Sequence, residues 1–284
     1  MMHSPSMLRR YDAMCERVAG DVIAHYSTSF SLATRFLGPQ VRADVRNLYA
    51  MVRIADEIVD GAADDHAAEL LDAYEAQVVA APHARFHTDP VIHAWALSAR
   101  RCRFSEDHVR AFFASMRRDL NQSTYDPADF DAYVYGSAEV IGLMCVAAFV
   151  ADEPVTATQR AELDNGARAL GSAFQKVNFL RDLAEDRDDL GRTYFPQLRG
   201  RGIDDAVKAE LVDDIRADLA RARRAIPLIP SSARGAVAAA EALFSELTER
   251  IDATPAAALA TTRVSVPRHR KLYLTARAVR RNRG

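Results

Sequence analysis

Residues 175–196 read QKVNFLRDLAEDRDDLGRTYFP, and carboxylates crowd the middle of this stretch. Asn178, Asp182 and Asp186 are spaced four residues apart, so an α-helix would place them on one face. Together with Gln175 they fall within an arc of roughly 80°. Like charges at this spacing cost a helix a few tenths of a kcal/mol per pair. The pattern therefore indicates a helix face that is suited to binding cations.

A second polar row lies in residues 47–60, which read NLYAMVRIADEIVD. On a helix this row spans an arc of roughly 60° and consists of Tyr49, Arg53, Asp56 and Asp60. An apolar stripe runs beside it and consists of Leu48, Val52, Ala55 and Val59. Each row thus combines oxygen ligands with an apolar flank, whereas an ordinary solvated helix face mixes charges of both signs.

Two such rows are more informative than one, because a single D-x-x-x-D pattern is common on exposed helices. Magnesium binds through one or two carboxylates and shares its remaining positions with water and substrate phosphates. Two facing rows would hold several such ions, with a diphosphate between them. Arg53 and Arg181 are candidates for a phosphate clamp, since guanidinium groups bind phosphate through paired hydrogen bonds.

Other classes of site are disfavoured by the sequence. None of the eight histidines has Glu three residues before it, which excludes a di-iron bundle. The glycine-rich loops of nucleotide-binding proteins and the nucleophile elbow of hydrolases are missing from the sequence. The net charge of −2 gives no reason to expect nucleic-acid binding. The three cysteines are far apart, so neither a disulfide framework nor a zinc site is expected.

The termini and apolar runs favour a cytoplasmic protein. The first residues, MMHSPSMLRRYDAM, lack the apolar segment of a signal peptide. The longest uninterrupted apolar run, residues 141–151, is too short to span a bilayer.

Helix signals divide the chain into blocks. Alanine is abundant and glycine sparse, which favours helices. Pro39 opens a block that extends to about Asp60, and Asp126-Pro127 opens another to about Val150. A capping box at 156–159 opens a long block that is expected to reach Asp189. Further blocks are expected near 204–226, 231–253 and 267–281. The pattern predicts one all-α domain over residues 1–284, with roughly eight to twelve helices.

The segment from about residue 263 is strongly basic and contains no acidic residue. Its cations are Arg263, Arg268, Arg270, Lys271, Arg277, Arg280, Arg281 and Arg283. Two interpretations stay open: a solvated and frayed tail, or a basic face that contacts anionic lipid or a polyphosphate substrate.

Taken together, these segments resemble the squalene/phytoene synthase family, the head-to-head prenyltransferases, over almost the whole chain. The matching stretches are YSTSFSLA (26–33), YAMVRIADEIVD (49–60), YVYGSAEVIGLM (133–144), QKVNFLRDLAED (175–186), GRTYFP (191–196) and RVSVPRHRKL (263–272). The most specific are the two aspartate motifs, R-x-x-D-x-x-x-D and Q-x-x-N-x-x-R-D-x-x-x-D.

The resemblance implies an all-α prenyl-synthase fold, a class I terpenoid synthase bundle around a central cavity. It implies a magnesium cluster, with manganese as a substitute, held by Asp56, Asp60, Asn178, Asp182 and Asp186. The same four aspartates and Tyr133 are the expected catalytic residues. The residues expected to bind the substrate diphosphates are Arg53, Arg181, Gln175, Ser29, Tyr49 and Phe30. NADPH is not expected as a cofactor.

The expected reaction joins two geranylgeranyl diphosphates through a cyclopropylcarbinyl diphosphate and gives phytoene. A farnesyl diphosphate-using enzyme that makes dehydrosqualene, squalene or presqualene diphosphate remains open. A class I terpene cyclase and a catalytically silent subunit are less favoured. The expected partners are allylic prenyl diphosphates and, peripherally, a membrane, with the chain as a monomer or weak homodimer.

Two details of the wall of this cavity are also predicted. Small residues are expected to line it, namely Ala138, Gly142, Gly171 and Ala173. Glu139 departs from the family pattern, in which a small residue is common, and is expected to pair with an arginine on a helix surface.

Overall fold

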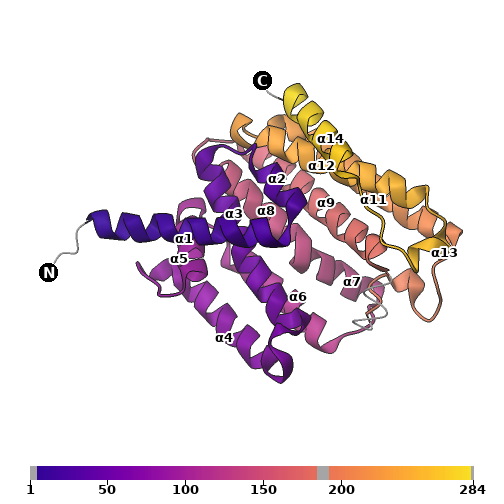
Figure 1. The fold of residues 1–284 in the computed structure, drawn as a ribbon, viewed down its shortest axis with the longest axis horizontal. Coiled ribbons are helices and arrows are strands. Elements are labelled where there is room, and N and C mark those ends of the chain that lie inside the picture. Colours follow the sequence, from indigo (N-terminus) through magenta and orange to yellow (C-terminus); the bar gives the residue numbers. More distant parts are fainter. Residues whose placement is uncertain (1–4, 184–191, 283–284) are drawn as a thin grey trace.

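The computed structural model describes residues 5–183 and 192–282, and helices account for the regular structure in both ranges (Figure 1). A single isolated bridge joins Thr124 to Thr193. The described α-helices are α1 (Pro5–Tyr26), α2 (Thr28–Thr34), α3 (Pro39–Glu57), α4 (Ala67–Ala80), α5 (Pro90–Cys102), α6 (Glu106–Asn121), α7 (Pro127–Val134), α8 (Val140–Phe149), α9 (Ala157–Arg181), α11 (Asp205–Ala225), α12 (Ser231–Asp252), α13 (Ala256–Leu259) and α14 (Arg268–Asn282). The expected all-α class is confirmed. The helices outnumber the eight to twelve expected because short ones such as α2 and α13 have no clear sequence signal.

Shorter turns connect these helices. They are the π-helices η1 (Ile58–Ala62) and η4 (Tyr135–Glu139) and the 3₁₀ turns η2 (Asp64–His66), η3 (Ala81–His83), η5 (Pro196–Leu198) and η6 (Ile226–Leu228).

Several helix starts lie where the sequence predicts them. Pro39 occupies the first turn of α3, and the Asp126 side chain accepts a hydrogen bond from the N–H of Asp129 at the start of α7. Thr156 and Gln159 form the predicted reciprocal capping box of α9. These contacts satisfy N–H groups that have no partner inside the helix.

The end of α9 differs from the prediction. The helix was expected to reach Asp189, but α9 ends at Arg181. Asp182 lies outside the helix, although its N–H still bonds to the Asn178 carbonyl at 2.9 Å. A helix C-terminus carries partial negative charge, so the Asp182 carboxylate is unfavourable inside the last turn of α9. Residues 184–191, which include Asp186, Asp188 and Asp189, lie outside the described part of the chain.

The end of α3 also differs from the prediction. The chain passes from α3 into the π-helix η1, which contains Asp60. A π turn is wider than an α turn, so Asp60 departs from the 60° arc expected for a regular helix. Single π turns of this kind are frequent at functional sites.

The arrangement of helices places α3 and α9 at the centre of two packed halves. Figure 1 shows α1 lying across the N-terminal half, with α11, α12 and α14 on the opposite side. α1 packs on α3 and α5, while α9 packs on α8 and α11, and α12 packs on α11 and α14. The predicted apolar stripe of α3 faces the core, where Leu48, Ala55 and Val59 are buried.

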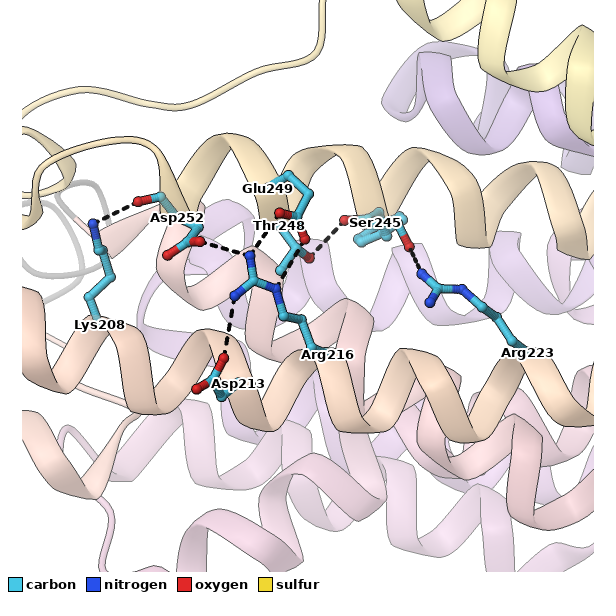
Figure 2. Close-up of polar contacts among 9 residues, drawn as sticks. Lys208, Asp213, Arg216, Arg223, Ser245, Thr248, Glu249 and Asp252 are labelled. Carbon is cyan, nitrogen blue, oxygen red and sulfur yellow. Dashed lines mark hydrogen bonds and ion pairs between the residues drawn. The ribbon is translucent and has the colours of Figure 1, made fainter.

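Polar contacts join α11 to α12 along one side of the molecule (Figure 2). Arg216 of α11 forms ion pairs with Glu249 and Asp252 of α12, each at 2.7 Å. The Lys208 ammonium donates to the backbone carbonyls of Asp252 and Thr254 at the end of α12. These contacts fix the register of α12, whose Phe244 stacks on Phe174 of α9 with a centroid distance of 3.7 Å.

The small residues of η4, α8 and α9 lie between helices. A Cβ on Gly171 would lie 2.6 Å from the Ala138 carbonyl oxygen, and one on Gly142 would lie 2.6 Å from the Ala167 carbonyl oxygen. Ala173 is fully buried in the core. The expectation that these residues line a cavity is therefore wrong for Gly142 and Gly171, because they are needed for close approach of α9 to its neighbours.

Within the described residues, one helical stretch is apolar and long enough to cross a membrane by length and composition. It is Pro127–Phe149, and half of its most apolar window is buried inside the protein. Val140 and Met144 of this stretch belong to the core. Core packing therefore accounts for its apolar character.

Candidate functional site

The first aspartate row lies on α3 and η1. Arg53 forms an ion pair with Glu57, and one of its terminal nitrogens lies 3.7 Å from an Asp56 carboxylate oxygen. Its guanidinium group also lies over the Tyr26 ring of α1, 4.4 Å from the centroid. Arg53 is thus held on both sides, which aligns it for a cation–π contact and for charge pairing along the row.

Asp56 experiences strong electrostatic stress. Burial raises the pKa of its carboxyl group to about 8; Arg53 opposes this, while the carboxylates of Asp60, Asp119 and Glu57 add to it. About a third of the side chain remains accessible. A carboxylate surrounded by other carboxylates favours a cation as its neighbour.

Asp119, near the end of α6, was not anticipated by the sequence reasoning. Its side chain is 5% exposed and accepts a hydrogen bond of 2.9 Å from the Tyr133 hydroxyl. Burial raises its pKa to about 6, although Arg192 and Tyr133 favour the ionised form. The other carboxylate oxygen is buried without a hydrogen-bond partner among the described residues.

A sequence signal for Asp119 does exist. The buried stripe of α6 contains Val109, Phe112, Phe113 and Met116. Asp119 continues this stripe at helical spacing, so it places a carboxylate where an apolar residue is expected.

Arg192 connects the first row to Asp119. One terminal nitrogen lies 3.6 Å from an Asp60 oxygen, and the other donates to the Asp119 backbone carbonyl at 2.9 Å. The backbone beside it is fixed because the N–H of Thr193 donates to the Ser123 carbonyl at 2.8 Å. The GRTYFP segment was recognised in the sequence, but the role of Arg192 within it was not.

Aromatic rings surround this polar group. Tyr133 lies 5.0 Å from Tyr125 and 5.3 Å from Tyr194, measured between ring centroids. Phe179 of α9 stacks on Tyr194 at 4.0 Å. Burial raises the pKa of Tyr133 well above its ordinary value, so its hydroxyl stays protonated as a donor to Asp119.

The second row lies on the last turns of α9 and just beyond it. Asp182 forms an ion pair with Arg181, and an Arg263 nitrogen lies 2.8 Å from an Asp182 oxygen. Arg181, predicted to bind phosphate, is thus paired with a carboxylate of its own motif. Gln175 and Asn178 are half-buried on α9.

The two rows are connected through aromatic contacts. Phe30 of α2 lies 6.4 Å from Tyr49 of α3 and 6.1 Å from Phe174 of α9. Burial raises the pKa of Tyr49.

The Ser29 side chain and Asp186 lie outside what the structure describes. The structure groups Asp56, Asp60 and Asp119, whereas Asp182 is held separately by its two arginines.

The donor chemistry of the rows suits magnesium. Their candidate ligands are carboxylate and amide oxygens, the donors that this hard cation prefers. Among the described residues, no three acidic, histidine or cysteine side chains form a ready-made metal cage. Magnesium requires only one or two protein carboxylates when substrate phosphates supply other ligands. The Asp119 oxygen that has no hydrogen bond lies 4.0 Å from an Arg192 nitrogen and so already faces a cation, whereas Asp56 with its neighbouring carboxylates fits a further one.

Two hollows on the surface lie elsewhere. One, of about 880 Å³, adjoins α7, η4, α9 and α11; the other, of about 410 Å³, adjoins α1 and α5. Neither is lined by Asp56, Asp60 or Asp182, the aspartates of the two rows that the structure describes. Glu139 faces the larger hollow and pairs with Arg168 at 2.6 Å, which confirms its predicted pairing with an arginine.

Comparisons with known proteins extend this picture. The family model described as squalene/phytoene synthase matches residues 23–270. Phytoene synthase 3, chloroplastic, from Zea mays is 34% identical over 216 residues, which are 72% of this chain and 50% of that protein. Phytoene synthase 2, chloroplastic, from Solanum lycopersicum is 32% identical over 256 residues, 82% of this chain and 80% of that protein. The chain thus spans about half the length of the maize protein.

A solved structure shows the same fold. The crystal structure of a dehydrosqualene synthase in complex with ligand has a TM-score of 0.78 with this chain at 22% identity, and the match covers 96% of each chain.

Proposed function

This chain belongs to the squalene/phytoene synthase family, and we propose that it is a prenyltransferase that joins two geranylgeranyl diphosphates head to head to give phytoene, in carotenoid biosynthesis. The observation that carries the proposal is the group of Asp56, Asp60 and Asp119: burial raises the pKa of Asp56 to about 8, and the neighbouring carboxylates of Asp60 and Asp119 raise it further against the opposing effect of Arg53. Such a group of carboxylates favours a site for cations that accompany a diphosphate.

Asp56, Asp60, Asn178, Asp182 and Asp186 would hold magnesium, with manganese as a substitute. When bound, the metal supplies Lewis-acid stabilisation of the charge that develops on the departing diphosphate.

Arginine side chains bind the diphosphates in this proposal. Arg53 already lies beside Asp56, and Arg181 and Arg263 lie beside Asp182. An arriving diphosphate competes with these carboxylates for the guanidinium groups, since both anions accept paired hydrogen bonds. Gln175 and Ser29 are further candidates for diphosphate contacts.

Aromatic rings are the proposed contacts of the carbocation intermediates. Loss of the first diphosphate leaves an allylic carbocation, which the double bond of the second substrate attacks; the resulting cation loses a proton to the released diphosphate and closes the ring of a cyclopropylcarbinyl diphosphate. Loss of the second diphosphate and a rearrangement then join the two head carbons, and loss of a second proton gives the neutral hydrocarbon. Phe30 and Tyr49 provide π faces for such cations, and Phe174 and Phe244 stack behind Phe30 and exclude water.

Tyr133 orients the polar side of the site. Its protonated hydroxyl donates to Asp119, and Asp119 in turn lies beside Arg192, which pairs with Asp60. In this proposal Tyr133 and Asp119 keep Arg192 and Asp60 aligned while charge moves between the substrates.

The preferred substrate length rests on the relatives. The maize and tomato relatives, each at least 32% identical over more than two thirds of this sequence, are described as phytoene synthases, which favours geranylgeranyl diphosphate. Phytoene formation needs no reductant, so NADPH is not expected. A farnesyl diphosphate-using activity that gives dehydrosqualene, squalene or presqualene diphosphate is the alternative.

Product analysis tests the proposal. The purified protein is incubated with magnesium and either farnesyl or geranylgeranyl diphosphate, with and without NADPH. A forty-carbon hydrocarbon formed without NADPH is expected, and Asp56→Asn should abolish it, whereas Asp21→Asn on the exposed face of α1 should not. A thirty-carbon product would overturn the proposed chain length, and a cyclised monomeric terpene would overturn head-to-head condensation.

A further inference from the structure

The C-terminal helix α14 has two distinct faces. Its inner face packs on α12 and buries Leu274, Thr275, Ala278 and Val279. We define the α14 outer face as the exposed residues Arg268, His269, Leu272, Tyr273, Ala276, Arg277, Arg280 and Arg281. The basic segment is therefore an ordered amphipathic helix, and the expectation of a frayed tail is wrong for the described residues.

The α14 outer face combines unpaired cations with large apolar side chains. Leu272 is 58% exposed and Tyr273 is 53% exposed. Arg277, Arg280 and Arg281 form no ion pair within the described ranges, whereas the neighbouring Arg270 is neutralised by Glu246.

The exposed Leu70 of α4 has a different setting. Leu70 on α4 is 48% exposed but lies between Glu69 and Asp72, which would repel an anionic surface. Large apolar side chains ringed by cations are typical of helices that lie in a membrane interface. The charge of the α14 outer face therefore selects an anionic bilayer among possible occupants.

The position of α14 relative to the aspartate rows connects its outer face to the proposed site. Just before this helix, Arg263 forms an ion pair with Asp182 of the second row. At its second turn, burial together with the nearby Arg181 and Arg268 lowers the pKa of Lys271. The start of α14 thus lies beside the second aspartate row.

We propose that the α14 outer face docks the protein on an anionic lipid bilayer, with Leu272 and Tyr273 entering the interface and the arginines contacting lipid phosphates. This proposal deepens the proposed function, because a forty-carbon hydrocarbon leaving beside Asp182 passes into lipid rather than water. Docking itself requires neither substrate nor metal, so it is tested independently of catalysis.

Vesicle cosedimentation provides the test. The full-length protein is mixed with vesicles of phosphatidylcholine alone or with one-third phosphatidylglycerol, without magnesium or substrate. Binding to the anionic vesicles is expected, and it should weaken in 0.5 M salt because the lipid charges are screened. Each surface cation contributes about fivefold to such binding, so R277Q/R280Q/R281Q should bind about a hundredfold more weakly.

Two matched controls distinguish binding through the α14 outer face from nonspecific binding of the protein to vesicles. The L272S/Y273S variant should lose at least tenfold in binding, while Leu70→Ser should bind like the wild type. Likewise R9Q/R10Q/R17Q, which removes three exposed arginines of α1, should leave binding within twofold. Circular dichroism should show unchanged helix content in all four variants, since every substituted side chain is exposed or lies on an outer face.

Three results would overturn the proposal. The first is equal binding of the α14 variants and their controls. The second is loss of binding only in the α1 variant. The third is vesicle-independent sedimentation that L272S/Y273S abolishes, which would make the α14 outer face a contact between two copies of the chain. A failure of phytoene synthesis with intact vesicle binding would instead count against the proposed function alone.

Discussion

The two aspartate rows differ in how the negative charge of their carboxylates is balanced. On α3 and η1, burial raises the pKa of Asp56, and the carboxylates of Asp60, Asp119 and Glu57 add to this effect. At the end of α9, Asp182 is neutralised by Arg181 and Arg263. In the first row the carboxylates outnumber their basic partners, whereas in the second row Asp182 is paired with two arginines.

This difference indicates how the site is prepared for its ligands. In the proposed function, a metal ion bound at the first row would relieve repulsion among its carboxylates and so add stability. A metal ion bound at the second row would displace arginines, which would then be free to bind the diphosphate. Metal and diphosphate are therefore expected to bind cooperatively. The metal would supply positive charge to the carboxylates, and the diphosphate would accept hydrogen bonds from the arginines that the metal displaces.

The largest expected effect is on turnover. Asp56→Asn and Asp182→Asn should each lower kcat/KM for allylic diphosphate by at least about a thousandfold, since each removes a proposed metal ligand from the site where negative charge develops on the leaving diphosphate. The readout is radiolabelled product extracted into organic solvent. Substantial activity in Asp182→Asn would remove the second row from the site.

The two substitutions should differ in the metal-free protein. With EDTA present at pH 7, Asp56→Asn should raise Tm because folding of the wild type requires proton uptake at Asp56, whereas the neutral amide requires none. Asp182→Asn should lower Tm by about 2 °C because it removes two partly buried ion pairs, each of which contributes about 1 kcal/mol or less. Differential scanning fluorimetry measures both. Equal shifts of the same sign would contradict the contrast between the rows.

A pH series sharpens the same contrast. The folded protein holds the Asp56 proton up to about pH 8, whereas the unfolded chain releases it near 3.8. The unfolded state therefore binds fewer protons between these values, so stability falls as pH rises through that window. In EDTA, Tm should decrease from pH 5 to pH 8 in the wild type, with a shallower decrease in Asp56→Asn. Identical slopes would exclude Asp56 as the source.

The smallest expected effect concerns two neighbouring tyrosines. Tyr133→Phe removes the hydrogen bond to Asp119 and should cost about 1–2 kcal/mol of unfolding free energy. The Tyr125 hydroxyl is buried near Asp119 and favours its ionised form, but it lacks a hydrogen bond of normal geometry, so Tyr125→Phe should cost less than Tyr133→Phe. Urea denaturation compares the two variants, and a larger loss for Tyr125→Phe would reverse the assignment.

Much of the fold and part of the site could be predicted from the sequence. Pro39, Asp126 and the capping box at 156–159 mark helix starts through local hydrogen bonding and backbone geometry, so a single sequence reveals them. The two aspartate rows are visible for the same reason, because each lies within a few turns of one segment. The pairing of Glu139 with an arginine also followed from its charge on a helix surface.

Features that depend on tertiary contacts were missed. Asp119 joins the first row through α6, and Arg192 reaches Asp60 from a segment more than 130 residues further along the chain. The π turn at Asp60 and the end of α9 at Arg181 reflect charge and packing that helical periodicity does not encode. Gly142 and Gly171 were misassigned because a small residue suits a cavity wall and a close helix contact equally well.

Binding of Mn²⁺ in the presence of inorganic diphosphate tests the central claim most directly. Electron paramagnetic resonance reports the free ion, so its loss of signal measures binding to the protein. The two rows should act as one site: wild-type protein should bind Mn²⁺ cooperatively with diphosphate, and either Asp56→Asn or Asp182→Asn should abolish that cooperativity. Unchanged diphosphate-dependent binding in Asp182→Asn would contradict the joint metal–diphosphate site.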